Sequence, residues 1–348
     1  MLIKKNPAGN AKSILTDLKS GIFLHEILEN ALLFKNDNQE LLFELARQRR
    51  SEFFSHEQVE VRSVIEVSNI CKQGCNYCTM GEKAELKNYT IDEPTLLALI
   101  DYLYYCNRRV FLFQSGENNR QDFIDMISVS IEKIKKKYPD CVILLCLGNL
   151  SREQYYQLRK AGADRYILKF ETSNPDIYHQ AKPNDTLEQR IHCMDNILEC
   201  GFELGSGNIT GLPKQTLTDI VKDLLFIHRY NLSMNSTTVF IPAETSVYRN
   251  EPHGDIDITL NAMALMRIMN PKRLMPTTGS LEKIQKGGQL KGLLAGANTV
   301  TVHDGTPEEL KDFFPIYSIN RVVPKQKHFE KIVTEANLKF NKEIKYYE

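Results

Sequence analysis

The stretch VRSVIEVSNICKQGCNYCTMG, from Val61 to Gly81, joins a β-rich run directly to three closely spaced cysteines. The run Val61–Val67 is rich in β-branched residues, which are enriched in strands. Gly, Asn and Gln then indicate a loop, where core packing of three thiols is not expected. A strand that delivers reactive side chains on the loop after it is typical of parallel α/β enzymes. The segment therefore indicates both a fold class and a site.

Further β-rich runs alternate with amphipathic segments along most of the chain, and this alternation predicts βα units and a parallel sheet. The expected strands are Val61–Val67, Val110–Gln114, Val142–Leu147, Arg165–Phe170, Glu203–Asn208 and Ser236–Ile241, with two weaker ones at Arg273–Met275 and Thr299–Val302. The expected helices include Pro94–Tyr105, Arg120–Lys137, Arg152–Ala161, Leu187–Cys200 and Thr216–Tyr230. Eight strands close a (β/α)8 barrel, so the predicted fold class is α/β with a TIM barrel.

The regions before and after the barrel have a helical pattern. Leu24, Ile27, Leu28 and Ala31 recur at three- and four-residue spacing near the N-terminus. We expect an N-terminal helical extension over 1–55, the barrel over 56–305, and a C-terminal helical tail over 306–348 that packs on the barrel.

Composition disfavours two classes of partner. Lys plus Arg equals Asp plus Glu, at 44 each, and no basic face stands out, which argues against nucleic-acid binding. No apolar run approaches the roughly 18 residues that span a bilayer. The start Met1–Asn6 has charges but no apolar region behind them, so a cytoplasmic location is expected.

The five cysteines outside the loop are scattered and are expected to pack in the core: Cys106, Cys141, Cys146, Cys193 and Cys200.

Cys71, Cys75 and Cys78 follow a C-x3-C-x2-C spacing. Zinc is the competing interpretation, but a structural zinc site has four closed ligands, and no Cys or His follows until Cys106. A cubane iron–sulfur cluster bound by three thiolates leaves one iron open to an exogenous ligand. The spacing therefore favours a [4Fe–4S] cluster used for chemistry.

Other polar residues follow the expected strands, where a barrel builds its active site. Ser115-Gly116-Glu117 combines close backbone approach with a carboxylate that accepts from an ammonium group. Glu171 could accept from ribose hydroxyls or an ammonium, and Arg190 could pair with a carboxylate, although a solvent-facing helix position is its alternative. Ser206-Gly207-Asn208 and Phe240-Ile241-Pro242 could line a ligand or serve ordinary packing.

The cysteine spacing, with Tyr77 directly before the last cysteine, resembles the radical S-adenosylmethionine (SAM) superfamily. The resemblance implies that the open iron chelates the methionine part of SAM and that reductive cleavage gives a 5′-deoxyadenosyl radical. It also implies a set of cofactor contacts, namely Tyr77, Ser115, Gly116, Glu117, Glu171, Arg190, Ser206, Gly207, Asn208 and Ile241. The catalytic residues of the substrate reaction are not assigned.

The order of motifs over about 55–305 resembles the branch that contains the [FeFe]-hydrogenase maturase HydE, the methylornithine synthase PylB and the [Fe]-hydrogenase cofactor protein HmdB, with biotin synthase further away. Leu144, Cys146, Asn149 and Phe170 depart from the HydE pattern toward lower polarity or charge. The resemblance implies a role in hydrogenase-cofactor biosynthesis, HydE-like or HmdB-like, on a substrate different from that of HydE.

Two alternatives stay open at this point. One is a PylB-like mutase, and the other is an iron–sulfur scaffold or carrier without radical turnover. The expected partners are a small-molecule or metal-cofactor precursor, an electron donor such as ferredoxin or flavodoxin, and other maturation proteins.

Overall fold

A single curved sheet of parallel strands organises the computed structural model, which describes residues 11–56, 58–80, 87–314 and 326–341. The strand order in the sheet is β6-β5-β4-β3-β2-β1-β7, so neighbours along the chain are mostly neighbours in space. The strands are β1 (Glu60–Ser68), β2 (Val110–Ser115), β3 (Val142–Cys146), β4 (Arg165–Ile167), β5 (Glu203–Thr210), β6 (Met234–Val239) and β7 (Thr299–Val302). The predicted α/β class is confirmed.

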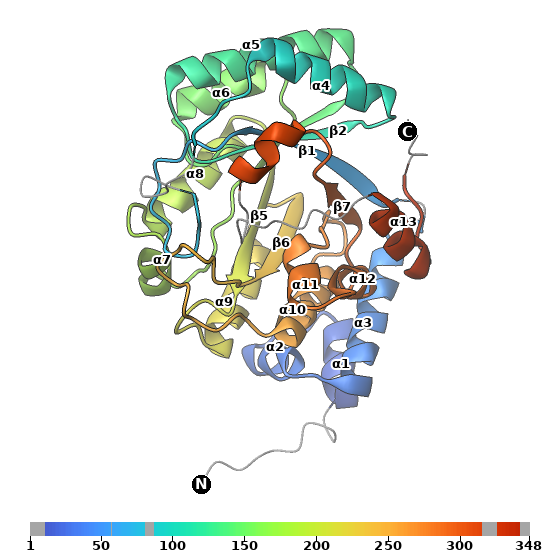
Figure 1. The fold of residues 1–348 in the computed structure, drawn as a ribbon. Coiled ribbons are helices and arrows are strands. Elements are labelled where there is room, and N and C mark those ends of the chain that lie inside the picture. The colour runs from blue at the N-terminus through green and yellow to red at the C-terminus, as the bar shows by residue number, and fades with distance from the viewer. Residues whose placement is uncertain (1–10, 57, 81–86, 315–325, 342–348) are drawn as a thin grey trace.

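Helices surround this sheet (Figure 1). They are α1 (Ala11–Lys19), α2 (His25–Leu32), α3 (Asn36–Ser51), α4 (Glu93–Tyr105), α5 (Gln121–Lys137), α6 (Arg152–Lys160), α7 (Pro175–Ala181), α8 (Leu187–Glu199), α9 (Leu217–Arg229), α10 (Ile256–Met269), α11 (Gly279–Ile284), α12 (Gly288–Leu294) and α13 (Gln326–Glu335), with a 3₁₀ helix at Glu308–Phe313. Local sequence sets several starts: Ser151 with Gln154, and Thr216 with Asp219, form capping boxes that satisfy free N–H groups. All five predicted helices are confirmed to within one or two residues.

One of the eight predicted strands is absent from the described part of the structure. Arg273–Met275 does not form a strand; Leu274 makes an isolated parallel bridge to Met234, and Pro276 makes one to Thr299. Proline has no N–H for a ladder, which limits pairing at this point. The structure thus shows a curled sheet of seven strands, and the closed eight-stranded barrel is not confirmed.

Strand alternation divides the buried side chains into two sets. Val64, Leu112 and Leu144 are in register on β1, β2 and β3, and together with Met234 they form a small apolar cluster. Their chain neighbours, such as Ile65, belong to the large cluster that includes helix residues, because successive side chains point to opposite faces of a strand. The small cluster therefore lies on the concave face of the sheet.

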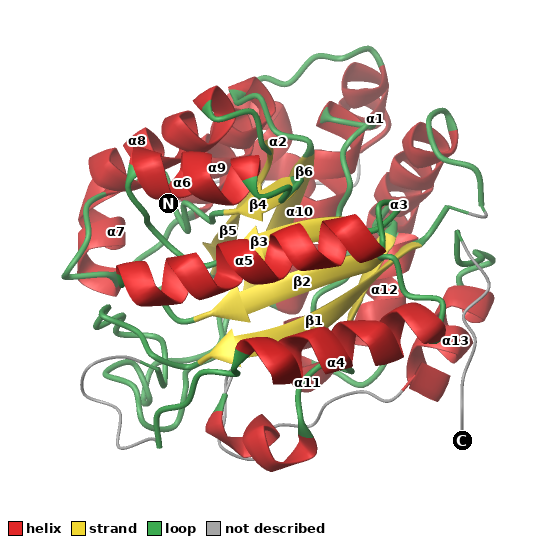
Figure 2. Ribbon diagram, turned by 90° about the horizontal axis from the view of Figure 1, so that it is seen from above, coloured by secondary structure: helices red, strands yellow, loops and turns green. Residues whose placement is uncertain are grey.

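A buried ion network lies at the N-terminal ends of the strands. Arg62 Nε donates to Glu60 at 2.7 Å, and Arg165 Nη1 donates to the second oxygen of Glu60 at 2.8 Å. Arg62 is only 2% exposed, so this end is closed by paired charges. The loops gather at the opposite end, toward which the arrowheads of β1 and β2 point (Figure 2).

The N-terminal helices pack against α10 and α12. Asn261 on α10 donates to the carbonyl groups of Leu32 and Phe34, and Arg50 on α3 donates to the carbonyl of Leu293 on α12. At the other end of the chain, α13 packs beside α12. These carbonyl groups lie at or just after the C-terminal ends of helices, where they have no partner within the helix. The side-chain donors satisfy them and so hold the connecting turns in place.

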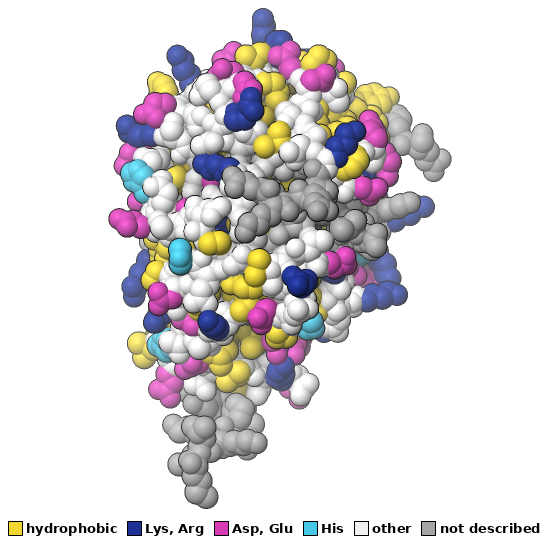
Figure 3. Space-filling model, turned by 60° about the vertical axis from the view of Figure 1, so that its left-hand side comes forward, with side chains coloured by type: hydrophobic (Ala, Val, Ile, Leu, Met, Phe, Trp, Pro, Cys, Tyr) yellow, Lys and Arg dark blue, Asp and Glu magenta, His cyan; other side chains and the backbone are white. Residues whose placement is uncertain are grey.

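The surface carries both signs of charge. On the face shown in Figure 3, basic and acidic side chains of the described residues are interspersed. Within the described ranges, no helix has the length and apolar character needed to cross a membrane.

Candidate active site

The three clustered cysteines lie on the loop that follows β1 and line one cavity of about 290 Å³. All three are half-buried free thiols. The loop is fixed by backbone hydrogen bonds: the Lys72 N–H donates to the carbonyl of Glu117 at 3.0 Å, and the Asn76 N–H donates to the carbonyl of Ala181 at 2.8 Å. Segments after three different strands therefore set the positions of the thiols.

Burial raises the pKa of the Cys75 and Cys78 thiols to about 12, and the neighbouring cysteines add to the effect. Without a metal these groups hold their protons, and iron must displace them to bind. The described residues contain no group of three or more His, Cys, Asp or Glu side chains that could hold one metal ion. A cubane does not require such a group, because each thiolate binds a different iron.

Gly116 allows the second strand loop to approach the cysteine loop. A Cβ at this position would lie 2.4 Å from the carbonyl oxygen of Ile70 and 2.6 Å from the Cβ of Cys71. Real Cβ contacts are not that short, so only glycine fits between the two loops. The close neighbour of Gly116 in the structure is thus the cysteine loop, and its approach to a bound ligand stays a prediction.

Glu117 lies beside Gly116 and is 6% exposed. Gln73 Nε2 donates to Glu117 Oε1 at 2.7 Å, and Arg190 Nη2 lies 3.5 Å from Glu117 Oε2. Lys72 adds a weaker contact, at 3.7 Å. Because these neighbours keep the buried carboxylate charged, it can also accept a hydrogen bond from the ammonium group of a ligand.

Arg190 is the fourth residue of α8, whose N-cap is Thr186, and its relative exposure is 3%. Its Nε donates to Tyr178 Oη at 2.9 Å, and its Nη2 donates to Asp185 Oδ2 at 2.8 Å. The alternative of a solvent-facing arginine is therefore wrong. Sequence reasoning missed Tyr178 and Asp185, because Asn-Asp-Thr before a helix is what an ordinary helix start contains.

Glu171 follows β4 in a left-handed conformation, with φ +63°. Such a conformation is uncommon outside glycine and needs support from its surroundings. Tyr77 Oη donates to Glu171 Oε1 at 3.3 Å, and Lys169 Nζ lies 3.1 Å from Glu171 Oε2. The carboxylate thus reaches from the fourth strand to the cysteine loop across the cavity mouth.

Most of the predicted cofactor contacts line this cavity: Tyr77, Ser115, Gly116, Glu117, Glu171, Arg190 and Ile241, beside the three cysteines. Ser206, Gly207 and Asn208 are not among the described residues that line it. Ser206 Oγ donates to the carbonyl of Leu168, and Asn208 donates to Asp223, because these two side chains of β5 point toward the helices. Ile209, one position further along β5, lines the cavity.

The inner part of the cavity contains groups outside the predicted cofactor set, namely Gln114, Cys146, Ile167, Lys169 and Thr238. Gln114 and Cys146 are in register on β2 and β3, one level above the apolar cluster. Cys146 was expected to be a core cysteine; it packs partly against that cluster and also lines the cavity. This part offers a mixed polar and apolar chamber below the cysteines.

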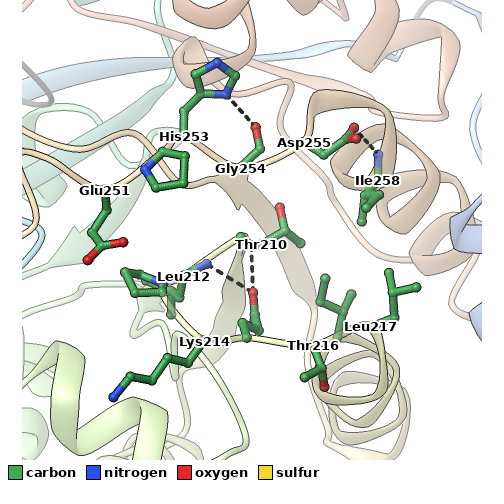
Figure 4. Close-up of a pocket in the computed structure, with 15 residues that line it drawn as sticks. Thr210, Leu212, Lys214, Thr216, Leu217, Glu251, His253, Gly254, Asp255 and Ile258 are labelled. Carbon is green, nitrogen blue, oxygen red and sulfur yellow. Dashed lines mark hydrogen bonds between the residues drawn. The ribbon is translucent and has the colours of Figure 1, made fainter.

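A second cavity of about 360 Å³ lies between the turn Thr210–Thr216 and the segment Glu251–Asp255 (Figure 4). Among the described residues, it shares no lining residue with the cysteine cavity. Asp255 accepts from the backbone N–H groups of Asp257 and Ile258 and thereby caps α10. The N-terminal turns of α9 and α10 are capped by Thr216 and Asp255, and this cavity lies on the outer side of the turn after β5.

The comparisons with known proteins agree with this geometry. The family model "Radical SAM superfamily" matches residues 65–227. The [FeFe] hydrogenase maturase subunit HydE of Thermotoga maritima is 33% identical over 308 residues, covering 88% of this chain and 87% of that protein. The biotin synthase of Geobacillus thermodenitrificans is 27% identical over 285 residues, covering 77% and 81%.

Solved structures share the fold. Methylornithine synthase (PylB) superposes with a TM-score of 0.81 at 18% identity, covering 94% of this chain and 97% of that one. HydG from Carboxydothermus hydrogenoformans gives 0.78 at 17% identity, covering 97% and 80%. At such identities these two structures support the fold alone. The similarity to HydE over most of both chains, together with the family match on the cysteine loop, decides the family. The chain therefore belongs to the radical SAM superfamily, whose members use a [4Fe–4S] cluster and SAM, and it is a radical SAM enzyme related to HydE.

Proposed function

We propose that this enzyme cleaves SAM reductively at a cluster held by Cys71, Cys75 and Cys78, as a step in the biosynthesis of a hydrogenase active-site cofactor. The single observation that carries the proposal is the convergence of these thiols with Glu117, Glu171 and Arg190 on one cavity. When bound, the cluster and SAM supply a 5′-deoxyadenosyl radical.

The donor set fits those cofactors. Three free thiols suit three irons of a cubane and leave the fourth open. Gly116 lets the loop after β2 pack directly against the cysteine loop, which places Glu117 beside the thiols. The buried pair Glu117 and Arg190 offers one acceptor and one donor fork, which match the ammonium and carboxylate of an amino acid.

We assign the other predicted contacts as follows. Glu171, held by Tyr77, faces the cavity and accepts from hydroxyl groups of the cofactor's ribose, while Ile241 supplies an apolar wall. Ser115 lies with Gly116 at the end of β2. Ser206, Gly207 and Asn208 contribute through the backbone of β5 and the support of its neighbours. These roles rest on the side-chain positions in the cavity and on the family.

The chamber below the cysteines is the proposed substrate site. Cys146 and Ile167, which pack against the apolar cluster, line it together with Gln114, Lys169 and Thr238. Lys169 Nζ lies 3.1 Å from Glu171 Oε2 and 3.5 Å from Thr238 Oγ1, so an anionic group of the substrate would share this ammonium group with Glu171. The cavity size suits a small molecule or a small metal-bearing precursor rather than a polymer.

A HydE-like role is favoured by the 33% identity over 88% of the chain. HmdB-like assembly of the guanylylpyridinol cofactor and PylB-like mutase chemistry are the competing pathways. We further propose a cytoplasmic enzyme that receives electrons from a ferredoxin or flavodoxin and works with other maturation proteins. We also propose a domain division into an N-terminal extension over 1–55, a barrel over 56–305 and a C-terminal tail over 306–348. In this proposal the segment 273–276 closes the barrel between β6 and β7, where it makes one bridge to each strand.

The first experiment is anaerobic reconstitution with iron and sulfide, reduction with dithionite and addition of SAM. We expect 5′-deoxyadenosine to form with an intact cluster. An intact cluster with bound SAM and no 5′-deoxyadenosine would indicate a scaffold or carrier instead.

The second experiment separates the HydE-like role from the PylB-like one. The loaded enzyme is added to an extract that matures [FeFe]-hydrogenase but lacks HydE, and hydrogen evolution is measured. Parallel samples contain lysine, to detect methylornithine. Restored hydrogen evolution supports the HydE-like role, whereas methylornithine without hydrogen evolution supports the PylB-like one.

A further inference from the structure

Three segments that carry site motifs meet at one buried carboxylate, that of Asp223 on α9, which is 0% exposed. Its Oδ1 accepts from the Ser173 N–H at 2.6 Å, from Ser173 Oγ at 2.7 Å and from Thr172 Oγ1 at 3.4 Å. Its Oδ2 accepts from Asn208 Nδ2 at 3.1 Å and from Gln215 Nε2 at 3.3 Å. Asp223 therefore joins the loop after β4, the strand β5 and the turn after β5.

The loop after β4 needs support because of its backbone conformation. Glu171 has φ +63°, which a side-chain-bearing residue adopts only when neighbours hold it there. Its own N–H donates to Gly207 and its carbonyl accepts from Ile209, at 3.1 and 2.8 Å. The next two residues are the ones bonded to Asp223. Backbone pairing holds Glu171 from one side, and Asp223 holds the chain directly after it.

The turn after β5 is tied to the same carboxylate through Gln215. The Gln215 Oε1 accepts from the N–H groups of Gly211 and Leu212, at 2.7 and 3.3 Å, and its amide donates to the carbonyl of Ile209 at 3.1 Å. Leu212 is seen in this turn in Figure 4. Ile209 lines the cysteine cavity, so the wall of that cavity shares its support with Glu171.

We propose that Asp223 is a positioning residue for the cofactor site and that it sets Glu171 in the orientation that binds SAM. Asp223 is not among the described residues that line the cavity, so it acts through the loop it holds. Asn208, which the sequence suggested as a cofactor contact, acts through this carboxylate. The inference rests on the role proposed above for Glu171.

The division of donors between the two oxygens makes the proposal testable. An asparagine at 223 has nearly the same shape but only one acceptor oxygen, and its NH₂ group faces donors whichever way the amide turns. Either Ser173 and Thr172 or Asn208 and Gln215 then lose their acceptor. Asp223→Asn therefore loosens one side of the support without opening a cavity in the core.

The experiment measures SAM affinity by anaerobic titration of the cluster-loaded protein, for wild type, Asp223→Asn, Glu171→Gln and the double variant. We expect each single variant to bind SAM roughly tenfold more weakly, because each loses a hydrogen bond to a charged group. In the double variant the two losses should be far from additive, since Asp223 acts through Glu171. Asp164→Asn is the matched control: that carboxylate also accepts from a backbone N–H, that of Ile143 at 2.8 Å, but at the start of β3.

The measured quantities are the iron content, the SAM affinity of each single variant, and the additivity of the losses in the double variant. Iron content should stay at the wild-type level in all variants, and Asp164→Asn should keep wild-type SAM affinity. Wild-type affinity in a folded, cluster-loaded Asp223→Asn, additive losses in the double variant, or an equal loss in Asp164→Asn would each overturn the inference. Failure of wild type itself to bind SAM would instead refute the proposed function, and it is measured in the same titration.

Discussion

Gly116→Ala is the sharpest perturbation of the site, because one added methyl group meets the backbone of the cysteine loop. The new Cβ would lie 2.4 Å from the Ile70 oxygen, 2.6 Å from the Cys71 Cβ and 2.9 Å from the Ile70 carbonyl carbon. None of these atoms is the end of a flexible side chain. Relief of the shortest contact, from 2.4 to 3.4 Å, requires a displacement of about 1 Å.

The expected magnitude follows from that displacement. Overpacking in a well-packed site costs about 1–3 kcal/mol. This corresponds to a roughly 5- to 140-fold shift of an equilibrium that depends on the loop position. Metal–ligand distances tolerate only about ±0.2 Å, so a cysteine displaced by much more binds the cluster poorly. We expect Gly116→Ala to be less stable without iron and to hold its cluster weakly.

The assay has two parts, each with the same control. Urea unfolding of the iron-free protein measures the strain by itself, and iron and sulfide per chain after anaerobic reconstitution measure the cluster. Gly279→Ala is the control, because a Cβ there meets nothing within 4 Å and the residue opens helix α11. Alanine favours helices over glycine, so this control should be neutral or slightly stabilised. Wild-type unfolding and wild-type iron content in Gly116→Ala would refute the reasoning.

Three further predictions concern the same site. Arg190→Gln should lower SAM affinity and cost about 1.5–3 kcal/mol of unfolding free energy, because buried Asp185 loses its 2.8 Å partner but keeps Lys182 at 3.3 Å; unchanged values in a SAM titration and urea unfolding would contradict this. Cys75→Ala should lose its iron–sulfur absorbance, whereas Cys200→Ala, outside the cavity, should keep it; equal iron content in both would remove the ligand assignment. Burial raises the pKa of Asp223 from 3.8 to about 7, so between these two pH values the folded protein binds one proton more than the unfolded chain. The contribution of Asp223 to stability is therefore lost as the pH rises through 7. The unfolding free energy of wild type should then fall relative to Asp223→Asn between about pH 4 and 7 and level off above that range, and a difference that does not change with pH in urea unfolding would disprove it.

The cysteine loop and the strand before it could be predicted from the sequence, because both depend on local properties. Val61–Val67 is a β-branched run, and three cysteines at short spacing in a polar loop have few other uses. Helix starts were predictable for the same reason, since Ser151 and Thr216 cap helices through residues only three positions away. Strand Thr299–Val302 was found by composition alone.

Closure of the sheet could not be read from local properties. Arg273–Met275 has a strand-like composition, but it forms a single bridge to β6 through Leu274, and the bridge to β7 is formed by Pro276, which cannot donate to a ladder. Whether such a segment pairs depends on how far apart β6 and β7 lie, which is a property of the whole curved sheet.

The sequence by itself determined the chemistry of this protein, namely three thiols, a glycine beside a carboxylate, and an arginine near a helix start. Only the tertiary structure decided which side chains meet. It buried Arg190 between Tyr178 and Asp185, turned Asn208 away from the cavity, and brought Asp223 to the loop that follows Glu171. The physical reason is that residue type and spacing set what a group can bind, whereas burial and hydrogen-bond partners come from segments far apart in the chain. Asp223 shows this most clearly, since it lies 52 positions after Glu171 and no local pattern distinguishes it from any other helix aspartate.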